Sequence, residues 1–224
     1  MTFEIVTVPG RVVPETFRKI DARPDVTPVV LGASDRLDDL LYPHTPKREP
    51  ETVLEIAEAL DVADWLRKRE NTQRTAWKEN GFAWPPRGAF EGLPYRGDVL
   101  SQVSRDLVSN ELIDSVAIGI FPTTIPAEVP AYLDAGGWNA FPVSEVHVAL
   151  MRKWSAQYGA RLVGHETDLL SFAVERPPQD KESAYALAME QYLYCNDVVD
   201  QGYETLDALA ASLLDSAGWF LWWD

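Results

Sequence analysis

The chain has 224 residues, of which 46% are apolar and eight are tryptophan. Such a composition can bury enough apolar area to offset the entropy lost on folding, which excludes a disordered protein. The net charge of −15 disfavours binding to nucleic acids and to anionic membranes, because both present negative phosphate groups.

A soluble, cytoplasmic protein is expected from the same inventory. The chain has no run of about 18 apolar residues that could cross a membrane. Residues 1–10 also lack the basic and long apolar segments of a secretory leader. Cys195 is the only cysteine, so no internal disulfide can form.

Strand and helix patterns alternate in the first 112 residues. The β-branched runs 3–8 and 26–31 predict strands, and residues 14–22 predict a short helix between them. Ser34 is the expected cap of a helix over 35–41, and apolar spacing predicts a helix or helix pair over 51–70. Prolines predict a connector at 42–50, and four glycines with three prolines predict a long loop at 80–97.

The second half alternates in the same way. It begins with a buried strand at 116–121 and a short helix at 127–135, followed by a strong helix from a Ser144 cap to Tyr158. Residues 160–163 and 169–174 predict a hairpin, and Asp180 and Thr205 are expected to cap helices that reach 196 and 216. The terminal run 219–223 is apolar on both faces, so we place it inside a sheet.

These elements predict an α/β (α+β) fold with one mixed β-sheet. The strands at 116–121, 160–163, 169–174 and 219–223 should form that sheet, and the helices from Ser144 and Asp180 should pack on it. We expect an N-terminal α/β region over 1–112 packed on a C-terminal domain over 113–224.

Motifs for common cofactors are absent from the sequence. There is no glycine-rich phosphate loop of the Walker or dinucleotide type and no Gly-x-Ser-x-Gly elbow. The three histidines, His44, His147 and His165, fall in different predicted elements, and no Cys/His spacing suits zinc. No metal and no cofactor are therefore expected.

The loop at 80–97 has two interpretations. Long loops in compact domains often act as lids or binding loops, and this one carries four aromatic side chains. Alternatively, the aromatic residues fasten the loop to the body of the protein. They are Phe82, Trp84, Phe90 and Tyr95.

The turn at 136–142 is a candidate ligand site. Two glycines there permit a tight turn that presents Trp138 and Asn139, a flat apolar wall beside an amide with donors and acceptors. Turns between helices also use these residues for geometry alone. On the following helix His147 lies beside the apolar face, where it could act as a general base or be a hydrogen-bonded core histidine.

The helix after Asp180 carries the other candidates. Cys195 falls on its apolar face and is expected to pack as a small hydrophobic residue. Glu190, Tyr194 and Asp197 fall within roughly 60° of one another on a different face, if the helix continues that far. Two carboxylates and a phenol in this arrangement suit a cation or amine site or an acid/base pair, and if exposed they are a solvated acidic surface.

Charge is unevenly distributed along the chain. Residues 47–96 hold nine acidic and nine basic side chains, whereas residues 177–224 hold nine acidic side chains and Lys181 alone, a net charge of −8. An acidic surface attracts cationic partners, and it also keeps a protein soluble without any partner.

The C-terminal half resembles a bacterial family known as domain-of-unknown-function family 4253. Five features in order carry the resemblance: Trp138-Asn139-Ala140-x-Pro142, Trp154-x-x-x-Tyr158-Gly159-Ala160, Pro177-Pro178, Ala188-x-Glu190-Gln191-Tyr192-x-Tyr194-Cys195-x-Asp197 and Trp222-Trp223-Asp224. Phe141 departs from the pattern, because members of the family often have cysteine there. The resemblance implies an α/β fold and no established activity.

Segmental charge and missing catalytic motifs favour a non-enzymatic binding or interaction protein. Its acidic C-terminal half would engage a cationic protein or small-molecule ligand, and a toxin-neutralising, immunity-type protein is one concrete form. The alternative is a hydrolase or transferase, in which Asn139 orients the substrate and Glu190 or Asp197 is the acid/base. That alternative predicts one pocket holding Asn139 and at least one of the two carboxylates, with a perturbed pKa.

Overall fold

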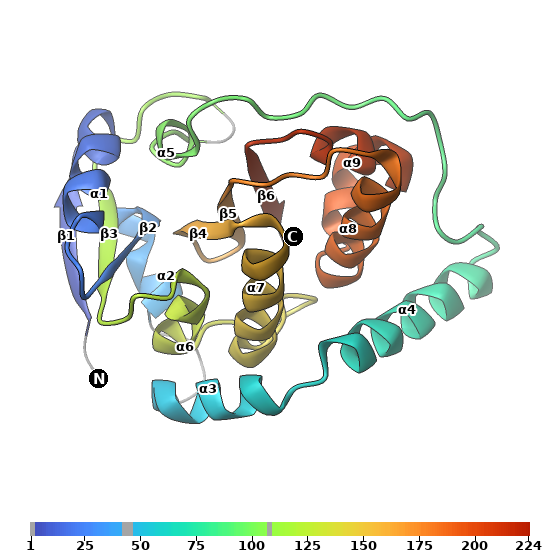
Figure 1. Ribbon diagram of the computed structural model, residues 1–224, viewed down its shortest axis with the longest axis horizontal. Helices are drawn as coiled ribbons and strands as arrows, with labels where there is room; N and C mark the ends of the chain where they lie inside the picture. Colours follow the sequence, from blue (N-terminus) through green and yellow to red (C-terminus); the bar gives the residue numbers. More distant parts are fainter. Residues whose placement is uncertain (1–2, 42–46, 107–108) are drawn as a thin grey trace.

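The computed structural model describes residues 3–41, 47–106 and 109–224. In this part of the chain six strands form one sheet in the order β1-β3-β2-β4-β5-β6 (Figure 1). Neighbouring strands are antiparallel except β2 and β4, which are parallel, so the predicted mixed sheet is confirmed. The strands are β1 Glu4–Val8, β2 Thr27–Ala33, β3 Val116–Phe121, β4 Ala160–His165, β5 Leu169–Val174 and β6 Gly218–Trp222.

The two halves of the sequence share this sheet. Strand β2 comes from the first half, and it lies between β3 and β4 of the second half. Its residues 27–32 are buried, as expected for a central strand that is apolar on both faces. The strands of residues 113–224 are therefore contiguous only when β2 is in place.

Helices cover both faces of the sheet. On one face Val30, Ile118 and Val163 pack against α1 and α5. On the other face the alternate residues Val29 and Leu31 join a larger core with α6, α7, α8 and α9. The helices are η1 Gly10–Val12, α1 Val13–Asp21, η2 Ser34–Arg36, α2 Leu37–Leu41, α3 Pro50–Ala59, α4 Val62–Glu79, α5 Val99–Gln102, η3 Pro126–Glu128, α6 Val129–Leu133, α7 Ser144–Tyr158, α8 Lys181–Tyr194, η4 Val198–Tyr203 and α9 Leu206–Leu213.

Helix caps were predicted with mixed success. Asp180 and Thr205 accept hydrogen bonds from the backbone N–H groups of Ser183 and Ala208, as expected for N-caps. Ser144 does not cap α7, because it is the first helical residue and its Oγ donates to the Ala135 carbonyl at 2.8 Å. Ser34 likewise caps no α-helix and instead begins η2.

The terminal apolar run is a strand of the mixed sheet, as predicted, although it does not lie between two other strands. Among the strands of the described residues, β6 pairs with β5 alone, so it forms an edge of the sheet. Its side chains are nevertheless covered from both sides: Trp219 packs edge-on against Trp154 and Tyr158 of α7, and Phe220 packs against Tyr95 at 5.1 Å between ring centroids. Burial on both faces therefore comes from the layers above and below the strand.

The predicted loop at 80–97, called the strap here, passes outside α8 and α9 before it reaches α5 (Figure 1). Trp84 stacks on Tyr192 at 5.0 Å, and Phe90 lies 5.7 Å from Tyr185. With Tyr95 against Phe220, three of the four aromatic residues fasten the strap to the protein. Phe82 is 65% exposed.

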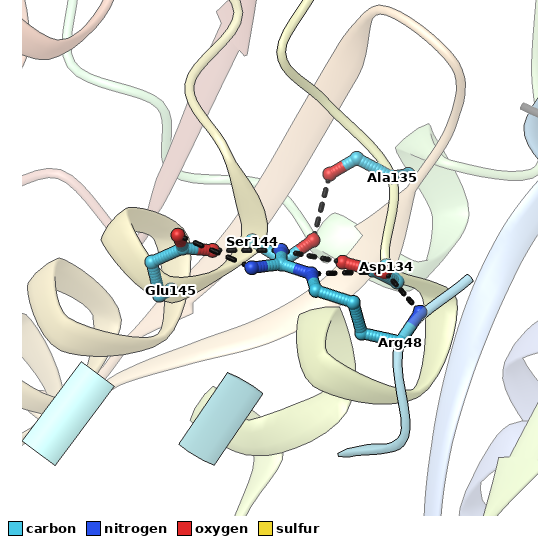
Figure 2. A network of polar contacts seen from close by, with 5 residues as sticks. All are labelled: Arg48, Asp134, Ala135, Ser144 and Glu145. Atoms are coloured by element: carbon cyan, nitrogen blue, oxygen red, sulfur yellow. Dashed lines mark hydrogen bonds and ion pairs between the residues drawn. The ribbon is translucent and has the colours of Figure 1, made fainter. Parts of the chain in front are cut away.

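A polar network ties the start of α3 to the second half of the chain. Figure 2 shows the Arg48 guanidinium between two carboxylates, with Nη2 at 2.7 Å from Asp134 Oδ1 and 2.8 Å from Glu145 Oε2. The backbone N–H of Arg48 also donates to Asp134 at 2.7 Å. The network holds α3 beside α6 and α7. None of the described helices has the length and apolar character needed to cross a membrane.

Candidate functional site

Three segments that are distant in sequence meet at one end of the molecule. Asn139 Nδ2 donates to the backbone carbonyl of Asp224 at 3.3 Å, and the backbone N–H of Asp224 donates to Asp197 Oδ2 at 3.0 Å. The backbone of residue 224 thus links the side chains of Asn139 and Asp197. We call this region, residues 136–142, 194–204 and 222–224, the C-terminal junction.

Trp223 forms the buried centre of the junction. It is 2% exposed, and its ring centroid lies 4.6 Å from that of Phe141 and 5.3 Å from that of Tyr194. Phe141 therefore serves as an aromatic packing residue. Cys195 also supports the terminal segment, because it is buried and its Sγ donates to the Trp222 carbonyl. The expectation that Cys195 packs as a small hydrophobic residue agrees with its complete burial.

His147 lies in the core beneath the junction. It is fully buried, and its Nδ1 is hydrogen-bonded to the hydroxyl of Tyr194. Burial, with a smaller contribution from nearby His165, lowers the pKa of His147 well below its usual value. Burial also lowers the pKa of His165 to about 4, so both imidazoles are neutral near pH 7. Neither ring reaches solvent, which favours a core role over general-base chemistry.

Glu190 is placed apart from the junction. Its carboxylate pairs with Lys153 and accepts a hydrogen bond from Trp154 Nε1 at 2.9 Å. Together with Leu60 and Leu66 it lines a cleft of about 690 Å³, of which Asn139 is not a wall residue.

Asp197 does not share the helix face predicted for it. Helix α8 ends at Tyr194, and Cys195 already has an extended conformation with φ of −135°. The helical rotation that aligned Asp197 with Glu190 therefore stops before residue 197. The chain then enters the π-helix η4, which the sequence pattern did not predict.

Asp197 is 6% exposed and is surrounded by neutral donors. Besides Asp224 N–H, it accepts hydrogen bonds from Asn196 Nδ2 at 3.1 Å and Gln201 Nε2 at 3.2 Å. Asp200 accepts from the Tyr192 hydroxyl at 2.7 Å and is exposed. Within the described residues no basic side chain pairs with the four junction carboxylates Asp197, Asp200, Glu204 and Asp224.

Exposed apolar side chains lie on the same segments or beside them. Trp138 is 36% exposed and packs on Phe141 at 5.5 Å, and Tyr203 of η4 is 37% exposed. Val143, directly after the turn, is 40% exposed. The junction surface thus combines aromatic side chains with negative charge that no base offsets.

Sequence reasoning missed Glu166. Burial, and then the nearby charge of Asp168, raise the pKa of Glu166 to about 7. Its carboxyl group lies over Gly32, where a Cβ atom would come within 2.6 Å of Glu166 Oε2, and Gly32 has φ of +86°. The sequence predicts residues 164–168 only as the turn of the hairpin between 163 and 169, and no local pattern shows that a glycine from β2 approaches this turn.

Comparison with known proteins bears on the C-terminal half. Residues 117–224 match the model of a protein family described as Domain of unknown function (DUF4253). Searches of curated proteins and of solved structures return no significant match. Residues 138–142, 194–197 and 222–224, which belong to three of the five segments that carry the sequence resemblance, lie in the C-terminal junction.

Proposed function

We propose that the protein, whose residues 117–224 match the DUF4253 family model, is a non-enzymatic binding protein whose C-terminal junction engages a cationic protein partner. One observation carries the proposal: the junction carboxylates have no basic partner in the described chain, whereas Glu190, Asp207 and Asp215 do. Unpaired charge at one place attracts and orients a partner of opposite charge.

Lysine and arginine side chains fit this surface best. The exposed face of Trp138 offers a cation–π contact, and the exposed carboxylates of Asp200, Glu204 and Asp224 offer ion pairs. Aromatic residues beside charged groups are also typical of protein interfaces. A toxin-neutralising, immunity-type role is one form of such binding, in which the partner is a basic protein.

The hydrolase or transferase alternative has less support. Glu190 is engaged by Lys153 and Trp154, and Asp197 holds the backbone N–H of Asp224. Asn139 itself donates to a backbone carbonyl. Each candidate catalytic group thus has a structural contact, and an acid/base pair would have to release one of them.

Charge neutralisation at the junction tests the proposal. A variant with Asp200→Asn, Glu204→Gln and Asp224→Asn should bind a ten-residue peptide of lysine and arginine about tenfold more weakly at low salt than the unmodified protein does. The matched control, Glu55→Gln, Glu58→Gln and Glu182→Gln, removes the same charge from exposed positions on α3 and α8.

Fluorescence anisotropy of the labelled peptide gives both affinities. Removing three negative charges anywhere lowers the long-range attraction for the peptide by the same amount. Apart from that effect, the control variant should change the affinity less than twofold. Equal losses in both triple variants would show that the peptide senses only the overall charge, and the junction would then not be the binding surface. Trp138→Ala should weaken binding further without changing the salt dependence, because it removes a contact and no charge.

A further inference from the structure

A cavity of about 320 Å³ lies between the strap and the second half of the chain, and it shares Val198 and Tyr203 of η4 with the C-terminal junction. Its walls come from α8, η4, α9 and β6, and residues 93–96 of the strap close one side. A single water needs only roughly 10–15 Å³ of such space, and ligand sites begin near 300 Å³. The cavity is therefore large enough for a small organic molecule.

Gln191 supplies the wall with an amide that has no protein partner. The residue is 1% exposed, and within the described residues neither its Nε2 nor its Oε1 makes a hydrogen bond. Its backbone lies inside α8, so its side chain is the part that can line the cavity. Burying an amide without a partner is unfavourable, and such groups in native proteins commonly mark a binding site or a bound molecule.

A second unpaired donor belongs to the same cavity. Trp219 is 2% exposed and lines it, and its Nε1–H also lacks a partner among the described residues. The two serine hydroxyls of the wall are already used: Ser212 Oγ donates to the Leu209 carbonyl at 2.7 Å, and Ser216 Oγ donates to the Gly218 carbonyl at 2.9 Å. The buried unpaired atoms of the wall are thus two donor nitrogens, Gln191 Nε2 and Trp219 Nε1, and one acceptor, Gln191 Oε1.

The remaining lining determines the charge and shape of the ligand. Leu209, Leu213 and Val198 are apolar, and no ionisable side chain lies in the buried part of the wall. Arg96 is exposed, and its guanidinium is paired with Asp215 at 2.7 Å. An ionised ligand would have no counter-charge inside, and burying a charge without one is strongly unfavourable.

Access to solvent is available at the rim. Arg96 and Tyr203 both line the cavity and are both exposed, so the space reaches the surface between the strap and η4. The strap is held in place beside it, because Ala217 N–H donates to the Tyr95 carbonyl at 2.8 Å and Tyr95 N–H donates to Ser216 Oγ at 3.1 Å. The wall is formed before any ligand binds.

We propose that this cavity binds a small uncharged molecule with an adjacent N–H and C=O, such as the edge of a lactam, ureido compound or nucleobase. A primary amide pairs with such an edge through two hydrogen bonds, one donated and one accepted, as glutamine does with a base edge in nucleic-acid recognition. The indole N–H of Trp219 supplies a further donor. The cavity borders the junction at η4, but none of the junction carboxylates lines it.

Two probes that differ by one methyl group test the assignment. 2-Piperidone carries the N–H and C=O edge, and N-methyl-2-piperidone keeps the shape but lacks the donor. A fragment of this size should bind with a Kd on the order of 1 mM, measured by ligand-observed NMR on the full chain. The methylated probe should bind at least about tenfold more weakly.

Gln191→Met and Ser212→Ala form the matched pair of variants. Gln191→Met removes both free amide atoms at similar length, so it should weaken 2-piperidone binding by about tenfold or more without lowering the melting temperature. Ser212→Ala changes the same wall but removes a hydroxyl that is already bonded, so its affinity should stay within about twofold. Equal binding of both probes, no binding of 2-piperidone, or unchanged affinity in Gln191→Met would each overturn the proposal.

Discussion

Carboxylates along the strap and those at the C-terminal junction have different surroundings, although both groups come from the same acidic stretch of sequence. Asp207 and Asp215 pair with Arg87 and Arg96 of the strap. Glu190, on the inner side of α8, pairs with Lys153. At the junction, by contrast, Asp197 receives only neutral donors, and the described residues provide no base for it.

This difference changes the meaning of the charge count. The basic partners of Asp207 and Asp215 lie in residues 47–96, the segment whose own net charge is zero. Folding thus brings basic side chains from residues 47–96 to the carboxylates along the strap, whereas the junction carboxylates receive no basic partner from the described residues. The net charge of residues 177–224 therefore describes neither the surface along the strap nor that of the C-terminal junction.

Removing residues 219–224 should have the largest effect, because it deletes the strand that both regions depend on. Trp219, Leu221 and Trp223 are each at most 2% exposed. Loss of large core side chains costs about 3–5 kcal/mol each, and the total stability of a domain is about 5–15 kcal/mol. We expect the truncated chain to be unfolded by circular dichroism. A cooperative melting transition at the original temperature would contradict this expectation.

Asp207→Ala should be the most damaging single change in the strap region. Asp207 is 5% exposed and accepts hydrogen bonds from Arg87, Tyr185 and the backbone of Gly88. We expect a loss of about 2–3 kcal/mol in the free energy of unfolding, measured with urea. The neighbouring junction carboxylate offers the contrast: Glu204→Gln should change stability by less than about 0.5 kcal/mol.

Asp207→Asn is the control for charge. It keeps the side-chain volume and one acceptor oxygen, so it should lose less stability than Asp207→Ala. If Glu204→Gln destabilised the protein as much as Asp207→Ala, the distinction between the two groups of carboxylates would be wrong.

Glu166 differs from both groups of carboxylates, because near pH 7 it is partly in the neutral, protonated form. Because its pKa is about 7, Glu166 holds its proton at higher pH in the folded chain than in the unfolded chain. The stability that the protonated Glu166 contributes is therefore lost as the pH rises through 7. His147 and His165 have lowered pKa values, so they bind protons first in the unfolded chain and destabilise the fold as the pH falls below about 6.5.

The opposing signs give a measurable prediction. Between about pH 6.5 and 5 the unmodified protein should lose about 2 kcal/mol of stability, because two histidines outweigh one carboxyl group. Glu166→Gln removes the opposing group and should lose about 3 kcal/mol over the same interval. Urea titrations at several pH values measure both slopes. Parallel slopes in the two proteins would show that Glu166 does not titrate in this range.

The sequence determined most of the elements and the single mixed sheet. Alternation, β-branched residues and the caps at Asp180 and Thr205 are local signals, and the strands and helices they predicted are present. The resemblance of the C-terminal half was also readable from short motifs, and the family match over 117–224 confirms it. Local chemistry is sufficient for such predictions because each signal involves residues within a few positions of one another.

Only the tertiary structure decided which side chains meet. The edge position of β6 depends on which strands pair with it. An apolar run in the sequence does not show whether it will pair with strands on both sides or be covered by helices and loops above and below the sheet. Asp197 does not lie on the same helix face as Glu190, because α8 ends three residues before it. Gln191 lines a cavity that the strap and β6 complete, and the carboxyl group of Glu166 lies against Gly32 of β2. These contacts join residues far apart in the chain, and the energy that selects them is packing and charge compensation, which no local pattern records.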